Sequence, residues 1–138
     1  MDFRKTKFDE IDRVMEILLD GKAALASLGI DQWQGEGYPA RDIVAGDVED
    51  GVSYVVEDAR GHLAATCMVS FSGEPDYDEI DGAWLTDGTS SDAGYAVVHR
   101  VAVAADSTGK GAARFMLTSA EEIAREQGAS SVRVDTHP

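Results

Sequence analysis

The spacing of apolar residues near the N-terminus predicts a long amphipathic helix over Phe8–Ala26. Five apolar residues recur there at helical intervals: Ile11, Val14, Met15, Leu18 and Leu25. A short edge strand, Phe3–Lys5, is predicted before the helix. Thr6 is the expected N-cap, with Asp9 at the acidic position of a capping box, and Gly29 is the expected stop.

A second amphipathic helix is predicted near the C-terminus, after two closely spaced glycines, and Gly128 is expected to end it. One side of this helix is apolar: Ala113, Met116, Leu117, Ala120, Ile123 and Ala124. The other side is charged: Glu121, Glu122, Arg125 and Glu126. A shorter helix is predicted at Ala40–Glu49, because it follows Pro39 and proline is favoured at a helix start.

Runs of β-branched and aromatic residues predict the strands of one sheet. Val52–Glu57 and His62–Phe71 are expected to form an antiparallel hairpin. A central strand is predicted at Ala93–Ala104, and a strand parallel to it at Ser131–Thr136 by the right-handed crossover rule. Simple alternation places Arg100 opposite a row of five residues: Tyr95, Val97, His99, Val101 and Val103. The pattern therefore predicts an α/β fold.

The segment Thr108–Ala113 joins the central strand to the last helix through a glycine turn. Proteins commonly hold a phosphate at such a place, because the start of a helix offers unpaired N–H groups and a partial positive charge. The P-loop pattern fails, because Ala104 and Gly111 stand where it requires a glycine and a Ser or Thr. The dinucleotide fingerprint fails because Arg114 replaces its third glycine. A nucleotide-phosphate site is therefore disfavoured.

The same segment resembles the pyrophosphate loop of the GCN5-related N-acetyltransferases, the GNAT family. The family pattern is Arg or Gln, any two residues, Gly, any residue, then Gly or Ala. Gly111 and Ala113 match it, and Thr108 replaces the Arg or Gln. DQWQGEGYP at 31–39, the Trp84 segment and the terminal VDTHP also resemble one bacterial subgroup. The resemblance implies a single GNAT-type domain over residues 1–138, with a mixed, mostly antiparallel central sheet and helices on both faces.

The resemblance also implies the activity, which is transfer of an acetyl group from acetyl-CoA to a primary amine by direct attack. The implied cofactor-binding residues are Val101, Ala102, Val103, Thr108, Gly109, Lys110, Gly111, Ala112, Ala113 and Arg114. Backbone groups of Val101 and Val103 would contact the pantetheine arm, and one of their amides would polarise the thioester carbonyl. No metal is expected, because the three histidines are scattered.

The acceptor side is implied by the same resemblance at Trp33, Tyr38 and Trp84. Core packing is the alternative role for Trp33 and Tyr38, since large aromatic residues commonly fill protein interiors. The long acidic connection Ser72–Asp92 contains Tyr77 and Trp84. A connection of this length is either a functional loop or a mobile insert.

His99 is the leading candidate for the general base, because imidazole titrates near neutrality and this residue stands two positions before Val101. A structural role on an apolar strand face is the alternative. Asp135 and His137 are further candidate bases. Cys67 is the one cysteine of the chain, and the apolar run around it favours buried packing over a role as a nucleophile.

Composition limits the classes of function and partner. A chain of 138 residues, 43% hydrophobic and 28% charged, suits one soluble domain. One cysteine and the lack of an apolar run near the roughly 20 residues of a membrane span favour the cytoplasm and no membrane contact. A net charge of −14 disfavours nucleic acid and favours a cationic amine, on a small molecule or a protein. Lys110, Arg100 or Arg114 would have to offset this charge near the anionic CoA.

The sequence stops where the family normally continues with another helix and two strands. We therefore expect a truncated or a naturally short form. Its Ser131–Thr136 strand would lie at a sheet edge, which favours a homodimer. A CoA-binding or assembly module without turnover is the alternative function, because the Asn and Tyr that usually follow in the family would lie beyond Pro138.

Overall fold

The computed structural model describes residues 1–35, 37–89 and 94–135, which contain one five-stranded sheet flanked by helices. The strands follow their chain order across the sheet: β1 (Asp2–Lys5), β2 (Ser53–Glu57), β3 (Leu63–Ser70), β4 (Tyr95–Val103) and β5 (Ser131–Arg133). Neighbouring strands are antiparallel, except β4 and β5, which are parallel. The predicted α/β fold with a mixed, mostly antiparallel sheet is confirmed.

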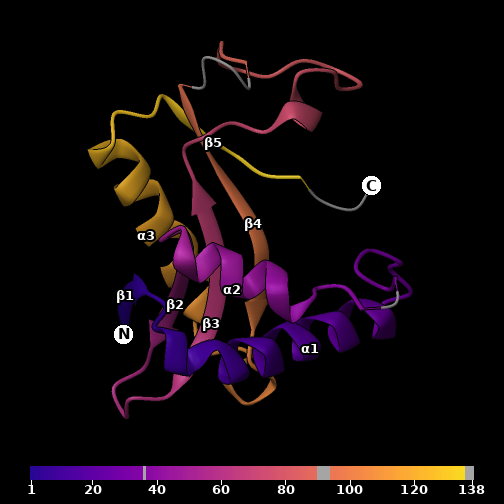
Figure 1. The fold of residues 1–138 in the computed structure, drawn as a ribbon, viewed down its shortest axis with the longest axis vertical. Helices are drawn as coiled ribbons and strands as arrows, with labels where there is room; N and C mark the ends of the chain where they lie inside the picture. Colours follow the sequence, from indigo (N-terminus) through magenta and orange to yellow (C-terminus); the bar gives the residue numbers. More distant parts are fainter. Residues whose placement is uncertain (36, 90–93, 136–138) are drawn as a thin grey trace.

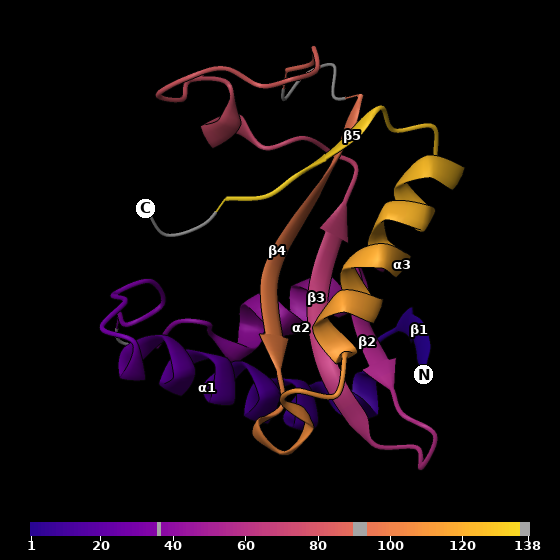
Figure 2. The same ribbon diagram turned by 180° about the vertical axis from the view of Figure 1, so that it is seen from behind.

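Helices cover both faces of this sheet (Figures 1 and 2). On one face lie α1 (Ile11–Ser27) and α2 (Arg41–Glu49), and on the other lies α3 (Ala112–Glu126). The described residues also form short 3₁₀ helices: η1 (Phe8–Glu10), η2 (Pro75–Tyr77) and η3 (Ala105–Ser107). The β3–β4 connection, which contains η2, extends beyond the end of the sheet. None of the helices in the described segments is both long and apolar enough to span a lipid bilayer.

The start of the first helix differs from the prediction. Thr6 is not an N-cap, because its N–H donates to the Ser53 carbonyl and its hydroxyl bonds the buried Ser53 hydroxyl at 2.7 Å. Pairing with Ser53 of the neighbouring strand, β2, therefore holds Thr6 at the sheet edge. Lys7 is the cap of η1, and its N–H donates to the Glu10 carboxylate at 2.8 Å. The α-helix then begins at Ile11.

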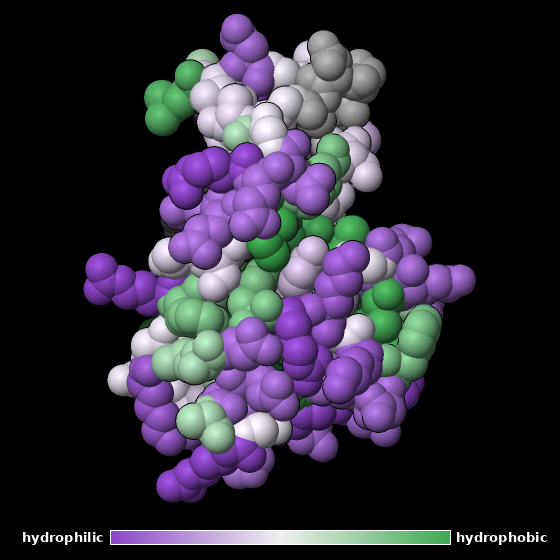
Figure 3. Space-filling model, turned by 90° about the vertical axis from the view of Figure 1, so that its left-hand side faces the viewer, coloured by the Kyte–Doolittle hydropathy of each residue, from purple (hydrophilic) through white to green (hydrophobic). Residues whose placement is uncertain are grey.

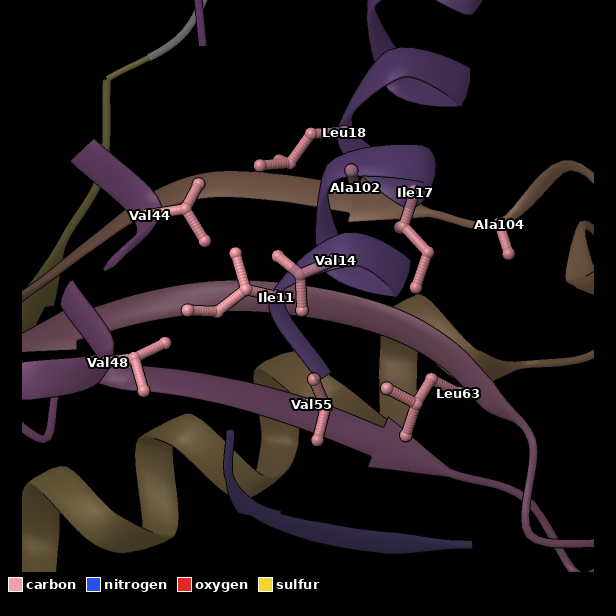
Figure 4. Close-up of a cluster of buried hydrophobic side chains, with 10 residues drawn as sticks. All are labelled: Ile11, Val14, Ile17, Leu18, Val44, Val48, Val55, Leu63, Ala102 and Ala104. Atoms are coloured by element: carbon pink, nitrogen blue, oxygen red, sulfur yellow. The ribbon is translucent and has the colours of Figure 1, made fainter. Parts of the chain in front are cut away.

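Apolar cores pack on both faces of the sheet, and a smaller cluster holds Tyr77, Tyr95 and Val97. The core under α1 and α2 is shown in Figure 4: Ile11, Val14, Ile17, Leu18, Val44, Val48, Val55, Leu63, Ala102 and Ala104. The core under α3 contains Ala112, Met116 and Ala120. Ala113 and Leu117 are exposed, contrary to the predicted apolar side of this helix. Because α3 begins directly after Gly111, the residues that face the core are Ala112 and then every fourth residue: Met116, Ala120 and Ala124.

β4 contains a β-bulge at Arg100. Thr66 of β3 pairs with Ala102, but Met68 of β3 pairs with His99, so two residues of β4 face one residue of β3. Arg100 has a φ angle of 52°, in the left-handed region. That conformation costs a residue other than glycine about 1–2 kcal/mol.

The bulge changes which residues of β4 share a face, and the predicted alternation is wrong there. Val101 and Val103 pack in the core under α3. His99 pairs with Met68 and lies on the opposite face, toward α1 and α2, where Arg100 also contacts α2. The prediction failed because alternation assumes a regular strand, and the extra residue of a bulge reverses every later position.

Candidate active site

The turn between β4 and α3 contains a row of backbone donors without partners. Gly109 and Gly111 have φ angles of 80° and 83°, which glycine adopts at little cost, and Gly111 caps α3. Within the described residues, no acceptor bonds the backbone N–H groups from Gly109 to Arg114. The first bond of the helix runs from the Phe115 N–H to the Gly111 carbonyl. These donors and the helix dipole form an anion-binding cradle.

The geometry and charge of the cradle fit a pyrophosphate. A Cβ added at Gly109 or Gly111 would meet no atom within 4 Å, so the backbone is open on that side. The first turn of α3 carries no acidic residue. The Thr108 hydroxyl and the Lys110 ammonium group donate to carbonyls of the same turn, at 3.4 and 3.0 Å. Both side chains therefore stabilise the turn.

The cradle adjoins an unpaired edge of β4. The pairing of β4 with β5 joins only Tyr95–Val97 and Ser131–Arg133, after which the chain leaves β4 (Figure 2). The Ala104 N–H donates to a β3 carbonyl at 2.8 Å. Since successive N–H groups of a strand alternate in direction, those of Val103 and Val101 point away from β3. Among the described residues, they face an edge without a neighbouring strand.

His99 lies between two carboxylates, close to the point where β4 and β5 separate. Its Nε2 is 3.7 Å from Glu74 Oε2, and its Nδ1 is 3.7 Å from Asp135 Oδ1. The Tyr77 hydroxyl donates to Asp135 Oδ1 at 2.8 Å, and the Tyr77 ring stacks on the imidazole with centroids 6.0 Å apart. These four residues, Glu74, Tyr77, His99 and Asp135, are called the His99 cluster.

The burial of the His99 cluster determines which atoms a substrate can reach. Nε2 of His99 is buried and has no hydrogen-bond partner within the described part of the chain, so an incoming molecule cannot reach it directly. The Asp135 side chain is 56% exposed. Burial and the hydrogen bond to Asp135 raise the pKa of Tyr77, so its phenol stays neutral and donates. Asp135 is therefore the exposed neighbour of the imidazole, on its Nδ1 side.

A buried arginine anchors the β3–β4 connection, which supplies two members of the His99 cluster. Arg133 of β5 is 3% exposed, and its guanidinium lies 4.5 Å from the Trp84 ring centroid and 3.9 Å from that of Tyr95. Trp84 donates from its indole N–H to the Tyr77 carbonyl at 2.9 Å. Tyr77 and Trp84 of this connection are thus held against Arg133 and the end of the sheet, while most of its other described residues are exposed.

Trp33 and Tyr38 lie on the α1 side of β4. Their rings meet edge to face, with centroids 6.2 Å apart. A Cβ at Gly21 of α1 would lie 2.9 Å from the Ala102 Cβ and 3.3 Å from the Trp33 ring, so Trp33 packs where α1 meets β4. Within the described residues, no ring contact joins these two residues to Trp84. The three predicted acceptor residues therefore form two separate groups.

One residue of the His99 cluster was not identified from the sequence, and one predicted residue does not join the candidate site. Glu74 lies in an acidic connection without periodicity, and the length of that connection was the one signal that pointed to it. Arg100 is an expected counter-charge for CoA, but it instead pairs with Asp47 of α2 at 2.6 Å and is 14% exposed. It is therefore not available to a phosphate. The candidate base His137 lies outside the described residues.

Cys67 is part of the packing rather than of the candidate site. Its side chain lies in the core under α3 and is 2% exposed. Burial raises the pKa of the Cys67 thiol to about 12. The nucleophilic thiolate is therefore strongly disfavoured, and the interpretation as buried packing is supported.

The comparisons with known proteins agree with this geometry. The Acetyltransferase (GNAT) family model matches residues 13–138. A GNAT-family acetyltransferase structure from Streptococcus agalactiae is 31% identical, with a TM-score of 0.78 over 99% of this chain and 75% of that chain. A GNAT-family acetyltransferase from Listeria monocytogenes is 17% identical, with a TM-score of 0.72 over 98% and 76% of the two chains.

A predicted acetyltransferase from Clostridium acetobutylicum, solved with acetyl-CoA, is 16% identical, with a TM-score of 0.62 over 99% of this chain and 80% of that chain. The comparison with curated proteins finds no match. The likenesses at 16% and 17% identity show the fold alone. The family match over most of the chain and the relative at 31% identity show the family as well as the fold. Together with the cradle at the start of α3, they establish that the chain belongs to the GNAT acetyltransferase family.

Proposed function

We propose that this protein transfers an acetyl group from acetyl-CoA to a primary amine by direct attack. The proposal rests on the row of unpaired N–H groups from Gly109 to Arg114 beside the open edge of β4. The row would bind the pyrophosphate, and backbone groups of Val101 and Val103 would bind the pantetheine arm. Membership of the GNAT family supports acetyl-CoA as the co-substrate.

The reaction balances without a covalent enzyme intermediate. The nitrogen lone pair of the neutral amine attacks the thioester carbonyl carbon, so a C–N bond forms and the C–S bond breaks. The products are the N-acetyl amine and CoA, whose thiolate takes up one proton after the nitrogen has lost one. The Val101 N–H at the open edge of β4 would donate to the carbonyl oxygen as negative charge develops there.

The attacking amine must first be neutral, and we assign the removal of its proton to the His99 cluster. Deprotonating an amine like that of lysine at pH 7 costs about 4.6 kcal/mol. The neutral imidazole would carry its proton on Nε2, on the side of Glu74, and Nδ1 would then accept. The proton would arrive there through Asp135, directly or by one water, because Nε2 is buried. Tyr77 holds Asp135 for this step through its 2.8 Å hydrogen bond.

We propose a cationic amine as the acceptor, on a small molecule or on a protein. The net charge of −14 attracts cations, and Glu74 and Asp135 add negative charge beside His99. Trp33 and Tyr38 would form an aromatic wall on the same side of β4. Neither nucleic acid nor a membrane is part of this proposal.

A thiol-release assay with acetyl-CoA and a panel of primary amines tests the function. Release that depends on the amine and exceeds acetyl-CoA hydrolysis is the expected result, with the acetylated amine identified by mass. CoA binding without amine-dependent release for any member of the panel would support a CoA-binding or assembly module instead. If the protein bound ATP and not CoA, neither an acetyltransferase nor a CoA-binding module would be supported.

The cofactor site has its own test, with a matched control. Gly111→Asp adds a Cβ and a negative charge inside the cradle, whereas Gly128→Asp adds both at the other end of α3, at a similar φ angle of 81°. We expect Gly111→Asp to weaken CoA binding at least about tenfold by calorimetry, and Gly128→Asp to leave it within about twofold. Unchanged affinity in a folded Gly111→Asp protein would refute this assignment.

A further inference from the structure

An ion pair between β4 and α2 holds the bulge at Arg100. Arg100 Nε donates to Asp47 Oδ2 at 2.8 Å, and its NH2 nitrogen is 2.6 Å from the same oxygen. The two side chains are only 14% and 16% exposed. They line a small cavity between the helices and the sheet, together with Ser53 and Thr66. The pair therefore anchors the bulge to α2 from the interior.

Arg100 requires such an anchor because of its backbone conformation. Its φ angle of 52° is one that glycine adopts freely and that a residue with a Cβ disfavours. No glycine stands at this position, so other contacts must offset the cost, and the polar contacts that the Arg100 side chain makes within the described residues are to Asp47. Asp47 supplies charge-assisted bonds to that side chain, and such bonds are stronger than neutral ones.

The bulge determines the direction of the Val101 N–H. Side-chain face and N–H direction alternate together along a regular strand. If β4 lost the bulge while His99 kept its register with Met68, Val101 would move to the face of His99. Its N–H would then point away from the open edge. The donor that the proposed reaction uses therefore exists only while Arg100 keeps its unusual conformation.

We propose that Asp47 is a positioning residue for acetyl transfer. By binding Arg100 it maintains the bulge, and the bulge directs the Val101 N–H at the place of the thioester carbonyl. The inference rests on the proposed function, because only a reaction at this edge makes the direction of that N–H matter. Asp47 pairs with Arg100 inside the protein, so its effect on the rate passes through the Arg100 backbone.

Two double variants separate the ion pair from the backbone conformation that it supports. D47A/R100G and D47A/R100A both lack the pair and both charges, but only glycine adopts the Arg100 φ angle freely. We expect D47A/R100A to turn over acetyl-CoA at least about tenfold more slowly than D47A/R100G, with the KM for the amine within about threefold. Equal kcat values in two folded proteins would overturn the proposal.

Binding supplies a readout that a purely structural role would not change. The Val101 N–H would contact the acetyl carbonyl, which CoA lacks, whereas the cradle contacts both molecules. Calorimetry should therefore show that D47A/R100A loses the preference for acetyl-CoA over CoA that D47A/R100G retains. Equal preference in the two double variants would count against the role of the bulge, whatever their stability.

A milder variant decides the matter if a double variant does not fold. D47N keeps the size of the side chain and removes its charge, and D12N does the same to the exposed Asp12–Arg41 pair between α1 and α2. We expect D47N to lower kcat at least about fivefold at unchanged CoA affinity, and D12N to change neither. An unchanged kcat in D47N would overturn the proposal. A wild-type protein without amine-dependent turnover would refute the proposed function first, and this inference with it.

Discussion

His99 shows how strongly the role of one side chain depends on its neighbours. Its side chain lies on the face of β4 opposite the Val101 side chain, so the predicted shared face is absent. Its Nε2 is buried, and Asp135 provides the exposed route to Nδ1. The proposed chemistry therefore belongs to the His99 cluster as a unit, since Asp135 is its exposed member.

Replacing His99 should affect the chemical step more than binding. His99→Ala is expected to lower kcat on the order of 10²-fold while acetyl-CoA affinity stays within about twofold, because the cradle is untouched. It should also remove one limb of the pH–rate profile. His62→Ala, at an exposed histidine before β3, is the control and should leave kcat and the profile unchanged. If His99→Ala keeps both the wild-type kcat and the limb of the pH–rate profile, His99 has a structural role.

The contact between α1 and β4 depends on a glycine in the middle of a helix. A Cβ at Gly21 would lie 2.9 Å from the Ala102 Cβ, closer than such atoms approach in proteins. Glycine normally weakens a helix, so its presence there is explained by the close approach of the helix to the strand. This contact also places Trp33, a candidate residue of the acceptor side, beside β4.

The same substitution at two helical glycines should therefore have opposite effects. Gly21→Ala is expected to destabilise the protein by about 1–3 kcal/mol, because the added methyl overpacks the contact with Ala102. Gly46→Ala in α2 meets no atom within 4 Å and should stabilise it by about 0.5–1 kcal/mol. Urea denaturation measures both. A Gly21→Ala protein as stable as Gly46→Ala would contradict this account of the contact.

A second element-scale contact predicts a dependence on pH. Arg4 of β1 donates to both oxygens of Glu10, at 2.9 and 2.8 Å, and so joins the edge strand to the start of α1. This pair lowers the pKa of Glu10 below its ordinary value. A lowered folded-state pKa contributes stability above the unfolded-state value, and that contribution is lost as the pH falls through the folded-state value.

Glu10→Gln should therefore make the free energy of unfolding depend less on pH in the acidic range. We expect the variant to be less stable than wild type by about 1 kcal/mol at neutral pH, and the difference to shrink as the pH falls below about 4. Unfolding free energies at several pH values measure this, with Glu122→Gln, at an exposed position of α3, as the control. A difference between Glu10→Gln and wild type that stays constant with pH would contradict the linkage.

At the scale of the whole molecule, the charge distribution affects the two proposed substrates in opposite ways. Twelve basic residues stand against 26 acidic ones, a formal net charge of −14. On the side shown in Figure 3, hydrophilic residues cover most of the surface, with hydrophobic ones in small patches among them. The long-range field therefore repels CoA and attracts cationic amines, while the cradle attracts phosphate only at short range.

Salt should consequently change the two Michaelis constants in opposite directions. Raising the ionic strength from about 0.02 to about 0.3 M should lower the KM for acetyl-CoA and raise the KM for a cationic amine, because both long-range effects are screened. Steady-state kinetics across this range, with a neutral salt, measures both. A rising KM for acetyl-CoA would mean that local cations such as Lys110 and Arg114 outweigh the overall field.

The sequence by itself determined the order and type of the elements and the place of the glycine turn before α3. Helical and strand periodicity are local, and so are the conformational needs of Gly109 and Gly111, so these features can be read from neighbouring residues. The resemblance to the GNAT family rested on the same turn, and the family match confirmed it. Local rules failed at Thr6, because pairing with Ser53 of the neighbouring strand β2 outweighs the general preference of threonine for an N-cap position.

Only the tertiary structure decided how the candidate site is assembled. The bulge at Arg100 is a property of the register between β3 and β4, and it reverses the face of Val101 relative to His99. Asp47 reaches Arg100 across 53 positions of sequence, and Tyr77 reaches Asp135 across 58. No periodicity encodes such contacts, because they form only when separate elements pack together. The sequence therefore located the cradle, whereas packing selected the neighbours of His99 and the direction of the Val101 N–H.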